Sequence, residues 1–284
     1  PSTGLKGITY EMPIASAQVK SSILLAGLNA EGKTQVKEKY PTRDHTEKMM
    51  KTFEANISFS KGIVEIERSD LKTPGQIEVP GDFSSAAFFM CACLISENSE
   101  IKIKNVGINN TRKAFLDCLL DMNANIDLTN IRQLGNEEVA DLVIKSSDLL
   151  PAKIMEDIVP NLIDELPLFF LIASLIEGES EFNGLSELKH KESDRLSIMI
   201  NNLQKLDVEV QLNEDSLKII GKKDRIFSDE VFDSHGDHRI AMTMLVAGLR
   251  SSEGLTITNV ECINTSFPEF IDQAKTLGFC FKNG

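Results

Sequence analysis

The sequence predicts an α+β fold built from repeated βαβαββ-like units. An apolar, alanine-rich segment that runs into an acidic residue with Gly or Asn, and then into a short strand, occurs four times, from Ser16, Asp82, Asp164 and Asp237. A shorter signature follows each copy: FEANI, MNANI, LDVEV and LGFCF, from Phe53, Met122, Leu206 and Leu277. A period of about 70 residues means that one supersecondary unit is used repeatedly.

The first copy illustrates the elements of the unit. Periodicity near 3.6 residues predicts helices over residues 16–28 and 46–54, and β-branched runs predict strands over 34–38, 57–60 and 63–67. Alternating runs predict further strands over 100–104 and 255–258. The first helix of each copy starts at Ser16, Asp82, Asp164 or Asp237, and all four are good N-cap residue types.

The first helices are apolar on nearly every face, so we expect them to pack together with the sheets outside them. The run TPGQIEVPG, residues 73–81, concentrates Pro and Gly between the first two copies. It predicts a small domain over residues 1–78 and a second domain over 79–284. Because a single copy makes a poor domain, we expect roughly two more copies upstream in the complete protein.

Composition narrows the functional classes. The chain has 284 residues, of which 42% are hydrophobic and 26% charged, as in a soluble globular protein. The net charge of −13 argues against general nucleic-acid binding, and neither a membrane span nor a signal peptide is visible. An odd count of five cysteines favours a reducing compartment.

The helix starts differ between copies, and these differences are the candidate site. Helix N-termini bind anions, so Ser16 and Thr42 suit a phosphate. Arg43, Arg195 and Arg239 could clamp phosphate or carboxylate groups, and Asp164 and Glu192 are candidates for proton transfer. Second-helix starts also include the segments Asn110-Thr111-Arg112 and Thr265-Ser266.

Structural alternatives stay open for each of these residues. Ser16, Asp82 and Asp164 could serve only as N-caps, and the run KHKESDR from Lys189 could be a solvated charged face. His235, Asp237 and His238 could suggest a metal, but a Gly-broken loop does not place them on one helix face. The residue pattern alone indicates a repeat-built enzyme acting on small anionic substrates.

The same segments resemble the 5-enolpyruvylshikimate-3-phosphate synthase family. The matching segments are LKGITYEMPIASAQVKSSILLAGL, RDHTEKM, VPGDFSSAAFF, NNTRKAF, IDELPLFFLIA, KESDRL, GDHRIAM and NTSFPEF, in family order from residue 5 to 270. The related UDP-N-acetylglucosamine enolpyruvyl transferases share the architecture but lack the IDELP and KESDR signatures.

The resemblance implies a two-domain enolpyruvyl transferase architecture, with three units in each domain about a pseudo-threefold axis and the active site in the cleft between them. It implies transfer of the enolpyruvyl group of phosphoenolpyruvate to the 5-hydroxyl of shikimate 3-phosphate, with release of phosphate and without metal or cofactor. It further implies a monomeric cytoplasmic enzyme (plastid in a plant) of aromatic amino-acid biosynthesis, with no nucleic-acid or membrane partner.

The resemblance also implies roles for individual residues. Shikimate 3-phosphate would contact Ser16, Gln18, Thr42, Arg43, Asp164 and Lys191, and phosphoenolpyruvate would contact Gln18, Arg195, His238 and Arg239. Asp164 would act as base toward the 5-hydroxyl, and Glu192 would act in proton transfer at the methylene carbon.

The chain departs from the family pattern at Ala17, where some members have a second serine, and at Thr265, where some have a lysine. The family's K-S-x-S-x-R segment would lie upstream of Pro1, so we expect this chain alone to be inactive. Two alternatives remain open at this point: a UDP-N-acetylglucosamine enolpyruvyl transferase, and a non-catalytic binding or structural module. An exposed apolar helix face in the first copy would predict dimerisation or disorder.

Overall fold

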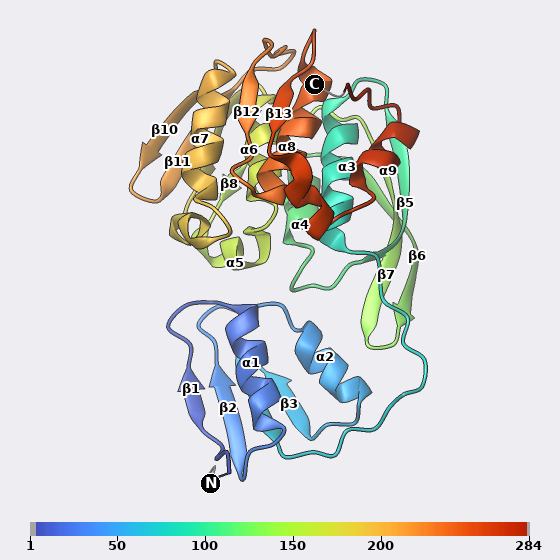
Figure 1. Cartoon of the computed structure of the whole chain (residues 1–284), viewed down its shortest axis with the longest axis vertical. Helices are drawn as coiled ribbons and strands as arrows, with labels where there is room; N and C mark the ends of the chain where they lie inside the picture. Colours follow the sequence, from blue (N-terminus) through green and yellow to red (C-terminus); the bar gives the residue numbers. More distant parts are fainter. Residues whose placement is uncertain (1–3, 283–284) are drawn as a thin grey trace.

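The computed structural model describes residues 4–282 and shows a small N-terminal α/β unit joined by an extended linker to a larger body (Figure 1). The small unit contains β1 (Thr9–Glu11), α1 (Ala17–Gly27), β2 (Lys33–Lys37), α2 (His45–Thr52), β3 (Ile57–Ser60) and β4 (Ile63–Glu67). Its sheet has the strand order β1-β2-β4-β3, with β1 parallel to β2 and the other pairs antiparallel.

The next unit repeats this plan. It contains α3 (Phe83–Ile95), β5 (Glu100–Gly107), α4 (Ala114–Asp121), β6 (Asn125–Leu134) and β7 (Glu137–Lys145). Its sheet has the order β5-β7-β6, and a parallel bridge from Gly81 to Val106 takes the place of the first strand.

The third unit contains β8 (Lys153–Ile154), η1 (Glu156–Ile158), α5 (Val159–Leu162), α6 (Leu166–Ser174), β9 (Gly178–Phe182), η2 (Ser186–His190), α7 (Arg195–Lys205), β10 (Glu209–Asn213) and β11 (Ser216–Gly221). Its strand order is β8-β9-β11-β10, with β8 parallel to β9. This order reproduces that of the first unit strand for strand, which confirms the predicted α+β repeat.

The fourth unit contains β12 (Val231–Asp233), α8 (His238–Ala247), η3 (Gly248–Arg250), β13 (Thr256–Thr258), η4 (Val260–Thr265) and α9 (Phe270–Thr276). Strands β12 and β13 pair in parallel, as the first two strands do in the first and third units.

The helices α3, α6 and α8 lie together at the centre of the larger body, with the sheets around them (Figure 1). Every residue of α6 is buried, and all of α3 except Ser85. The structure therefore bears out the expected packing of the apolar first helices. Burial of each large aliphatic or aromatic side chain stabilises such a core by about 1.5–3 kcal/mol.

Two separate hydrophobic cores lie on either side of the linker. The small core gathers buried side chains from α1, α2 and the first sheet, such as Leu24, Val36 and Ile66, and the large core extends from Phe83 to Ala274. Residues 68–80 form no helix or strand, and most of them are exposed.

Three of the four expected N-caps are present. Ser16, Asp82 and Asp237 accept hydrogen bonds from backbone N–H groups of the helix that each precedes. The expectation for Asp164 was wrong, because α6 begins one residue later with Glu165 at its N-cap position and no side-chain cap.

All five cysteines are free, and three of them, Cys91, Cys93 and Cys118, are buried. Burial raises the pKa of Cys93 to about 11 and that of Cys118 to about 12, so these thiols behave as small apolar side chains. Among the described residues, no helix combines the length and the apolar character needed to cross a bilayer.

Candidate active site

A cleft between the small unit and the third unit brings together most of the residues predicted to bind shikimate 3-phosphate. It is a cavity of about 350 Å³, and the predicted residues along its wall are Ser16, Gln18, Thr42, Arg43 and Lys191. The sixth predicted residue, Asp164, is joined to this set by Arg43, whose Nη1 lies 3.6 Å from Asp164 Oδ2.

Ser16 and Gln18 lie at the N-terminus of α1. The Ser16 hydroxyl accepts the Val19 backbone N–H at 3.3 Å and lies 3.5 Å from Gln18 Oε1. Ser16 is therefore an N-cap and also part of the cleft wall, so the capping and binding interpretations do not exclude each other.

A buried ion network holds the loop that carries Thr42 and Arg43. Lys20 Nζ lies 2.7 Å from Glu47 Oε1 and 3.1 Å from Glu38 Oε2, and it also donates to the Thr42 carbonyl at 3.3 Å. Burial raises the pKa of Glu47, although Lys20 opposes this shift. The network fixes the loop to α1, so Ser16 and Arg43 are positioned by one rigid assembly.

Thr42 itself is buried, and its hydroxyl is hydrogen-bonded to Glu38. An ionised carboxylate only accepts, so this bond uses the one proton of the hydroxyl. Arg43, with 29% of its side chain exposed, is the group in this loop that can meet an anion.

Asp164 is the shared partner of four arginines. Its carboxylate lies 3.4 to 3.8 Å from the guanidinium groups of Arg43, Arg112, Arg195 and Arg239. Burial alone would raise the pKa of Asp164, but the four positive charges hold it well below its usual range. Asp164 is thus ionised and is committed to side chains rather than to a helix cap.

Arg195 is fully buried, which contradicts the solvated-face interpretation of the KESDR run. Its Nε donates to Asp237 Oδ2 at 2.8 Å, its Nη1 to Asp164 Oδ1 at 3.4 Å, and its Nη2 to Glu192. Other residues of the run have different environments: Asp194 caps α7, and Glu192 keeps 54% of its side chain exposed.

His238 and Arg239 open α8 beside this cluster. Arg239 Nη2 lies 3.6 Å from Asp164 Oδ2, and its Nη1 donates to the Asp164 carbonyl at 3.3 Å. Burial, together with the charge of Arg239, lowers the pKa of His238, so this imidazole is neutral at pH 7. Asp237, bound to Arg195, holds the start of α8 in place.

Two residues of this cluster were missed as site candidates. Arg112 forms a fork with the fully buried Glu165, at 2.7 Å to Oε2 and 2.8 Å to Oε1. The repeat carried a usable signal for Arg112, since Thr111-Arg112 precedes α4 just as Thr42-Arg43 precedes α2. Nothing in the sequence marked Glu165 as more than a helix-start residue.

The remaining candidates lie apart from the cleft. Thr265 is exposed and donates its hydroxyl proton to the Cys262 carbonyl at 2.7 Å. Within residues 4–282, no three His, Cys, Asp or Glu side chains are arranged to hold a metal ion.

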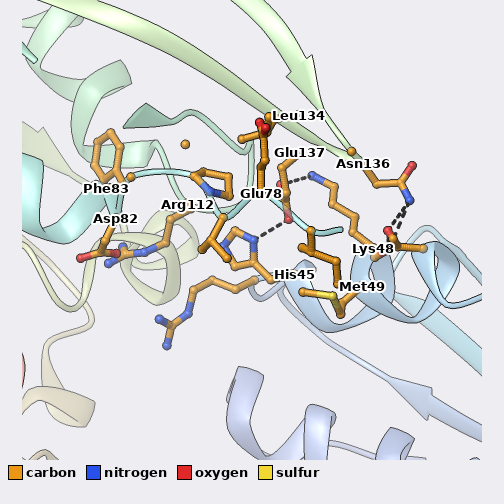
Figure 2. A pocket seen from close by; sticks show the side chains of 18 of the residues that line it. His45, Lys48, Met49, Glu78, Asp82, Phe83, Arg112, Leu134, Asn136 and Glu137 are labelled. Carbon is orange, nitrogen blue, oxygen red and sulfur yellow. Dashed lines mark hydrogen bonds and ion pairs between the residues drawn. The ribbon is translucent and has the colours of Figure 1, made fainter. Parts of the chain in front are cut away.

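A second cavity of about 600 Å³ lies beside the linker (Figure 2). Its wall is formed by α2, the linker and the tip of the β6–β7 hairpin, and it includes Met49, Val79 and Leu134. Of the predicted site residues only Arg43 borders it, whereas Ser16, Gln18, Thr42, Arg43 and Lys191 line the smaller cleft.

Comparisons with known proteins identify the family of the chain. The model of the family described as EPSP synthase (3-phosphoshikimate 1-carboxyvinyltransferase) matches residues 2–274. A 3-phosphoshikimate 1-carboxyvinyltransferase of Alkaliphilus metalliredigens is 44% identical over 96% of this chain and 64% of its own length. A protein of the same name from Geotalea uraniireducens is 46% identical over 94% of this chain and 62% of its own length.

Solved structures give the same result. EPSP synthase from Acinetobacter baumannii superposes with a TM-score of 0.88 and 42% identity, over 97% of this chain and 63% of that one. The enolpyruvyl transferase NikO from Streptomyces tendae shares the fold at 17% identity and a TM-score of 0.79. The chain spans a little under two thirds of the length of these relatives, and it belongs to the EPSP synthase family.

Proposed function

We propose that the protein carrying this chain transfers the enolpyruvyl group of phosphoenolpyruvate to the 5-hydroxyl of shikimate 3-phosphate. The observation that supports this most is the position of Asp164, a buried carboxylate shared by four guanidinium groups, one of which, that of Arg43, lines the cleft. Binding two anionic substrates requires local positive charge in a protein whose net charge is −13, and the arginines of this cluster supply it.

In this proposal the phosphate of shikimate 3-phosphate binds at the N-terminus of α1 through Ser16, with Gln18 beside it and Arg43 and Lys191 as its cations. The loop around Thr42 contributes its backbone and its position, because the Thr42 hydroxyl is bound to Glu38. Arg43 therefore carries more of the phosphate binding than Thr42 does.

Phosphoenolpyruvate would bind beside it, with Arg239, His238 and Gln18 as its contacts. The N–H donors of Arg195 already bind Asp237, Asp164 and Glu192. Arg195 can therefore bind phosphoenolpyruvate only if it releases one of these carboxylates. The exposed Glu192 is the partner that leaves most readily, and leaving also frees it for proton transfer.

The chemistry then proceeds by addition and elimination. Asp164 takes the proton of the 5-hydroxyl while the oxygen of that hydroxyl attacks C2 of phosphoenolpyruvate. Glu192 delivers a proton to the methylene carbon. The tetrahedral adduct loses phosphate, which leaves with the proton that Asp164 took up, and the methyl group returns a proton to Glu192 as the double bond forms again. Binding of substrate phosphate and carboxylate groups to Arg43 and Arg239 weakens the field on Asp164 and so makes it a better base.

The proposal extends to organisation and location. We place a domain boundary at residues 78–79, supported by the two separate cores and the exposed linker. We expect a monomeric cytoplasmic enzyme, and the five free thiols agree with a reducing compartment.

The test is an assay of phosphate release from phosphoenolpyruvate, with shikimate 3-phosphate or UDP-N-acetylglucosamine as the acceptor. The assay uses the full-length protein that contains this chain. We expect release that depends on shikimate 3-phosphate. Release that depends on the sugar nucleotide would contradict the acceptor, and binding of shikimate 3-phosphate without any release would favour a non-catalytic binding module.

A further inference from the structure

A buried pair of charged residues lies directly behind Asp164. Arg112, with 7% of its side chain exposed, binds both oxygens of Glu165, which is fully buried. Ser84 adds a third member, because its hydroxyl donates to Glu165 Oε1 at 2.6 Å and also contacts the Arg112 guanidinium. The same guanidinium lies 3.8 Å from Asp164 Oδ2.

Arg112 differs from Arg43 and Arg239 in its freedom to move. Arg43 and Arg239 meet Asp164 at 3.6 Å and keep 29% and 13% of their side chains exposed, so a substrate anion can draw them toward the cleft. A planar fork on a buried carboxylate is held by two parallel hydrogen bonds, and leaving it would strand the charge of Glu165. Arg112 therefore stays where it is when anions arrive.

We propose that Arg112 is a positioning residue for the proposed reaction: its anchored guanidinium holds the Asp164 carboxylate ionised and in place while Arg43 and Arg239 turn to the substrates. Glu165 acts through Arg112, and it also fixes the start of α6 next to Asp164 in the chain. This inference rests on the proposed function for the identity of the substrates, and on geometry alone for the link between Arg112 and Asp164.

The charged groups that face Asp164 come from four elements. Arg43 precedes α2, Arg112 precedes α4, Arg195 begins α7 and Arg239 begins α8. Glu165 lies behind Arg112 and 3.8 Å from Arg239 Nη1, and Glu192 and Asp237 pair with Arg195. The depressed pKa of Asp164 agrees with this set, in which Arg112 is one of the strongest contributors after burial and Arg239.

The test is a pH titration of the Asp164 side-chain carboxyl carbon by ¹³C NMR, with the signal assigned from its loss in Asp164→Asn. Arg112→Gln removes the charge, and we expect the Asp164 midpoint to rise by about one pH unit or more, the scale for a charge about 4 Å away. Arg112→Lys is the second variant, in case Arg112→Gln does not fold. The lysine ammonium can still pair with Glu165, but it cannot also reach Asp164. We expect a smaller rise there, of a few tenths of a unit.

Arg250→Gln is the matched control, since Arg250 is a partly buried arginine that binds backbone carbonyls away from the cluster. The Asp164 titration midpoint in Arg250→Gln should equal that of the wild type. An Asp164 midpoint that stays unchanged in the folded Arg112 variants would overturn the inference and leave Arg112 a purely structural residue.

The same samples separate this inference from the proposed function. Addition of shikimate 3-phosphate should shift the backbone signals of Ser16 and Arg43, and the Asp164 midpoint should rise more in Arg112→Lys than in the wild type. If shikimate 3-phosphate shifts no signals, the proposed substrate fails while the ligand-free titration still decides the role of Arg112. If shikimate 3-phosphate binds but raises the Asp164 midpoint equally in the wild type and in Arg112→Lys, Arg112 does not keep Asp164 ionised when the substrate is bound.

Discussion

At the scale of single residues, the central feature is a set of carboxylates that neutralise arginines inside the protein. Asp164, Glu165, Glu192 and Asp237 are paired with Arg43, Arg112, Arg195 and Arg239. The deeper pairs, Arg112 with Glu165 and Arg195 with Asp237, stabilise the structure, and the shallower arginines remain able to exchange partners. Burial thus divides one cluster into a fixed part and an exchangeable part.

Replacing Asp164 by Asn should remove the proposed base and leave the fold intact. We expect kcat for enolpyruvyl transfer to fall by a factor of about 10² to 10⁴, the usual contribution of a general base. The measurement is phosphate release at saturating substrates, with circular dichroism as the check on folding. Asp148→Asn, at a side chain that is 83% exposed, is the control and should keep the wild-type rate.

Replacing Lys20 by Met should destabilise the small unit strongly. Glu38 and Glu47 would then be buried without their cation, which costs about 3–5 kcal/mol of unfolding free energy. Urea unfolding measures this, and Lys33→Met is the matched control, because its pair with Glu65 is exposed and worth at most about 1 kcal/mol. Equal effects of the two substitutions would show that the buried network does not hold the loop.

The sequence indicated residue types well and residue environments poorly. Ser16 and Asp237 were expected at helix starts and cap them. Asp164 has the same residue type in the same place of the repeat, yet its environment comes from four arginines distant in sequence, and no local pattern reveals such a cluster. Arg195 was expected to clamp an anion, with a solvated charge run as the open alternative, and its burial against Asp164 and Asp237 depends on residues distant in sequence.

At the scale of elements, α2 and the tip of the β6–β7 hairpin form one contact between the two parts of the chain, besides those of Arg43 with Asp164 and of Asp44 with Asn109. His45 Nδ1 and Lys48 Nζ lie 2.7 and 3.1 Å from the two oxygens of Glu137, and Asn136 donates to the Thr52 hydroxyl at 2.7 Å (Figure 2). His45 is about half exposed, and it binds across the two parts.

This contact should weaken in acid. Burial opposes ionisation of Glu137, but hydrogen bonds and charges of His45 and Lys48 hold its pKa below the ordinary value of 4.5. A depressed folded-state pKa stabilises the protein above the unfolded-state pKa, and this stabilisation is lost as the pH falls through the folded-state value. Glu137→Gln should therefore cost about 1–3 kcal/mol at pH 7 and less below pH 4.

Urea unfolding of wild type and Glu137→Gln at both pH values measures the difference. Glu100→Gln is the control, because Glu100 is exposed and pairs with Lys145 on the surface of its own sheet. A Glu137 effect as large in acid as at neutral pH would contradict the role of its charge.

Elements were the level at which prediction worked best. The predicted helix over 16–28 and the strands over 57–60 and 63–67 lie within a residue of α1, β3 and β4 at each end. Hydrophobic periodicity and β-branched runs are local signals, so they fix element type and approximate bounds. How the small unit meets the larger body depends on contacts such as that of Glu137, which periodicity does not encode.

At the scale of the whole molecule, two cores of very different size share one polypeptide. The small core contains eight buried hydrophobic side chains, whereas the large one extends through three repeat units. Since burial of apolar surface dominates stability, the small unit should unfold first.

Limited trypsin digestion should cut the linker before other sites. Residues 68–80 have no helix or strand, and Arg68 and Lys72 are exposed trypsin sites within them. Mass spectrometry should find a stable fragment that starts at Ser69 or Thr73. The variant Arg68→Gln/Lys72→Gln should resist this cut, and a first cut within the larger body instead would argue against the boundary at residues 78–79.

The equivalent positions of Arg43 and Arg112 have a consequence for design. Each arginine precedes the second helix of its unit, yet one faces the cleft and the other is sealed against Glu165. A protein assembled from identical copies of an averaged unit would keep the architecture and its internal symmetry, but every such arginine would have the same surroundings. Catalysis in this fold therefore depends on broken symmetry, and an idealised symmetric version would be a stable scaffold without an active centre.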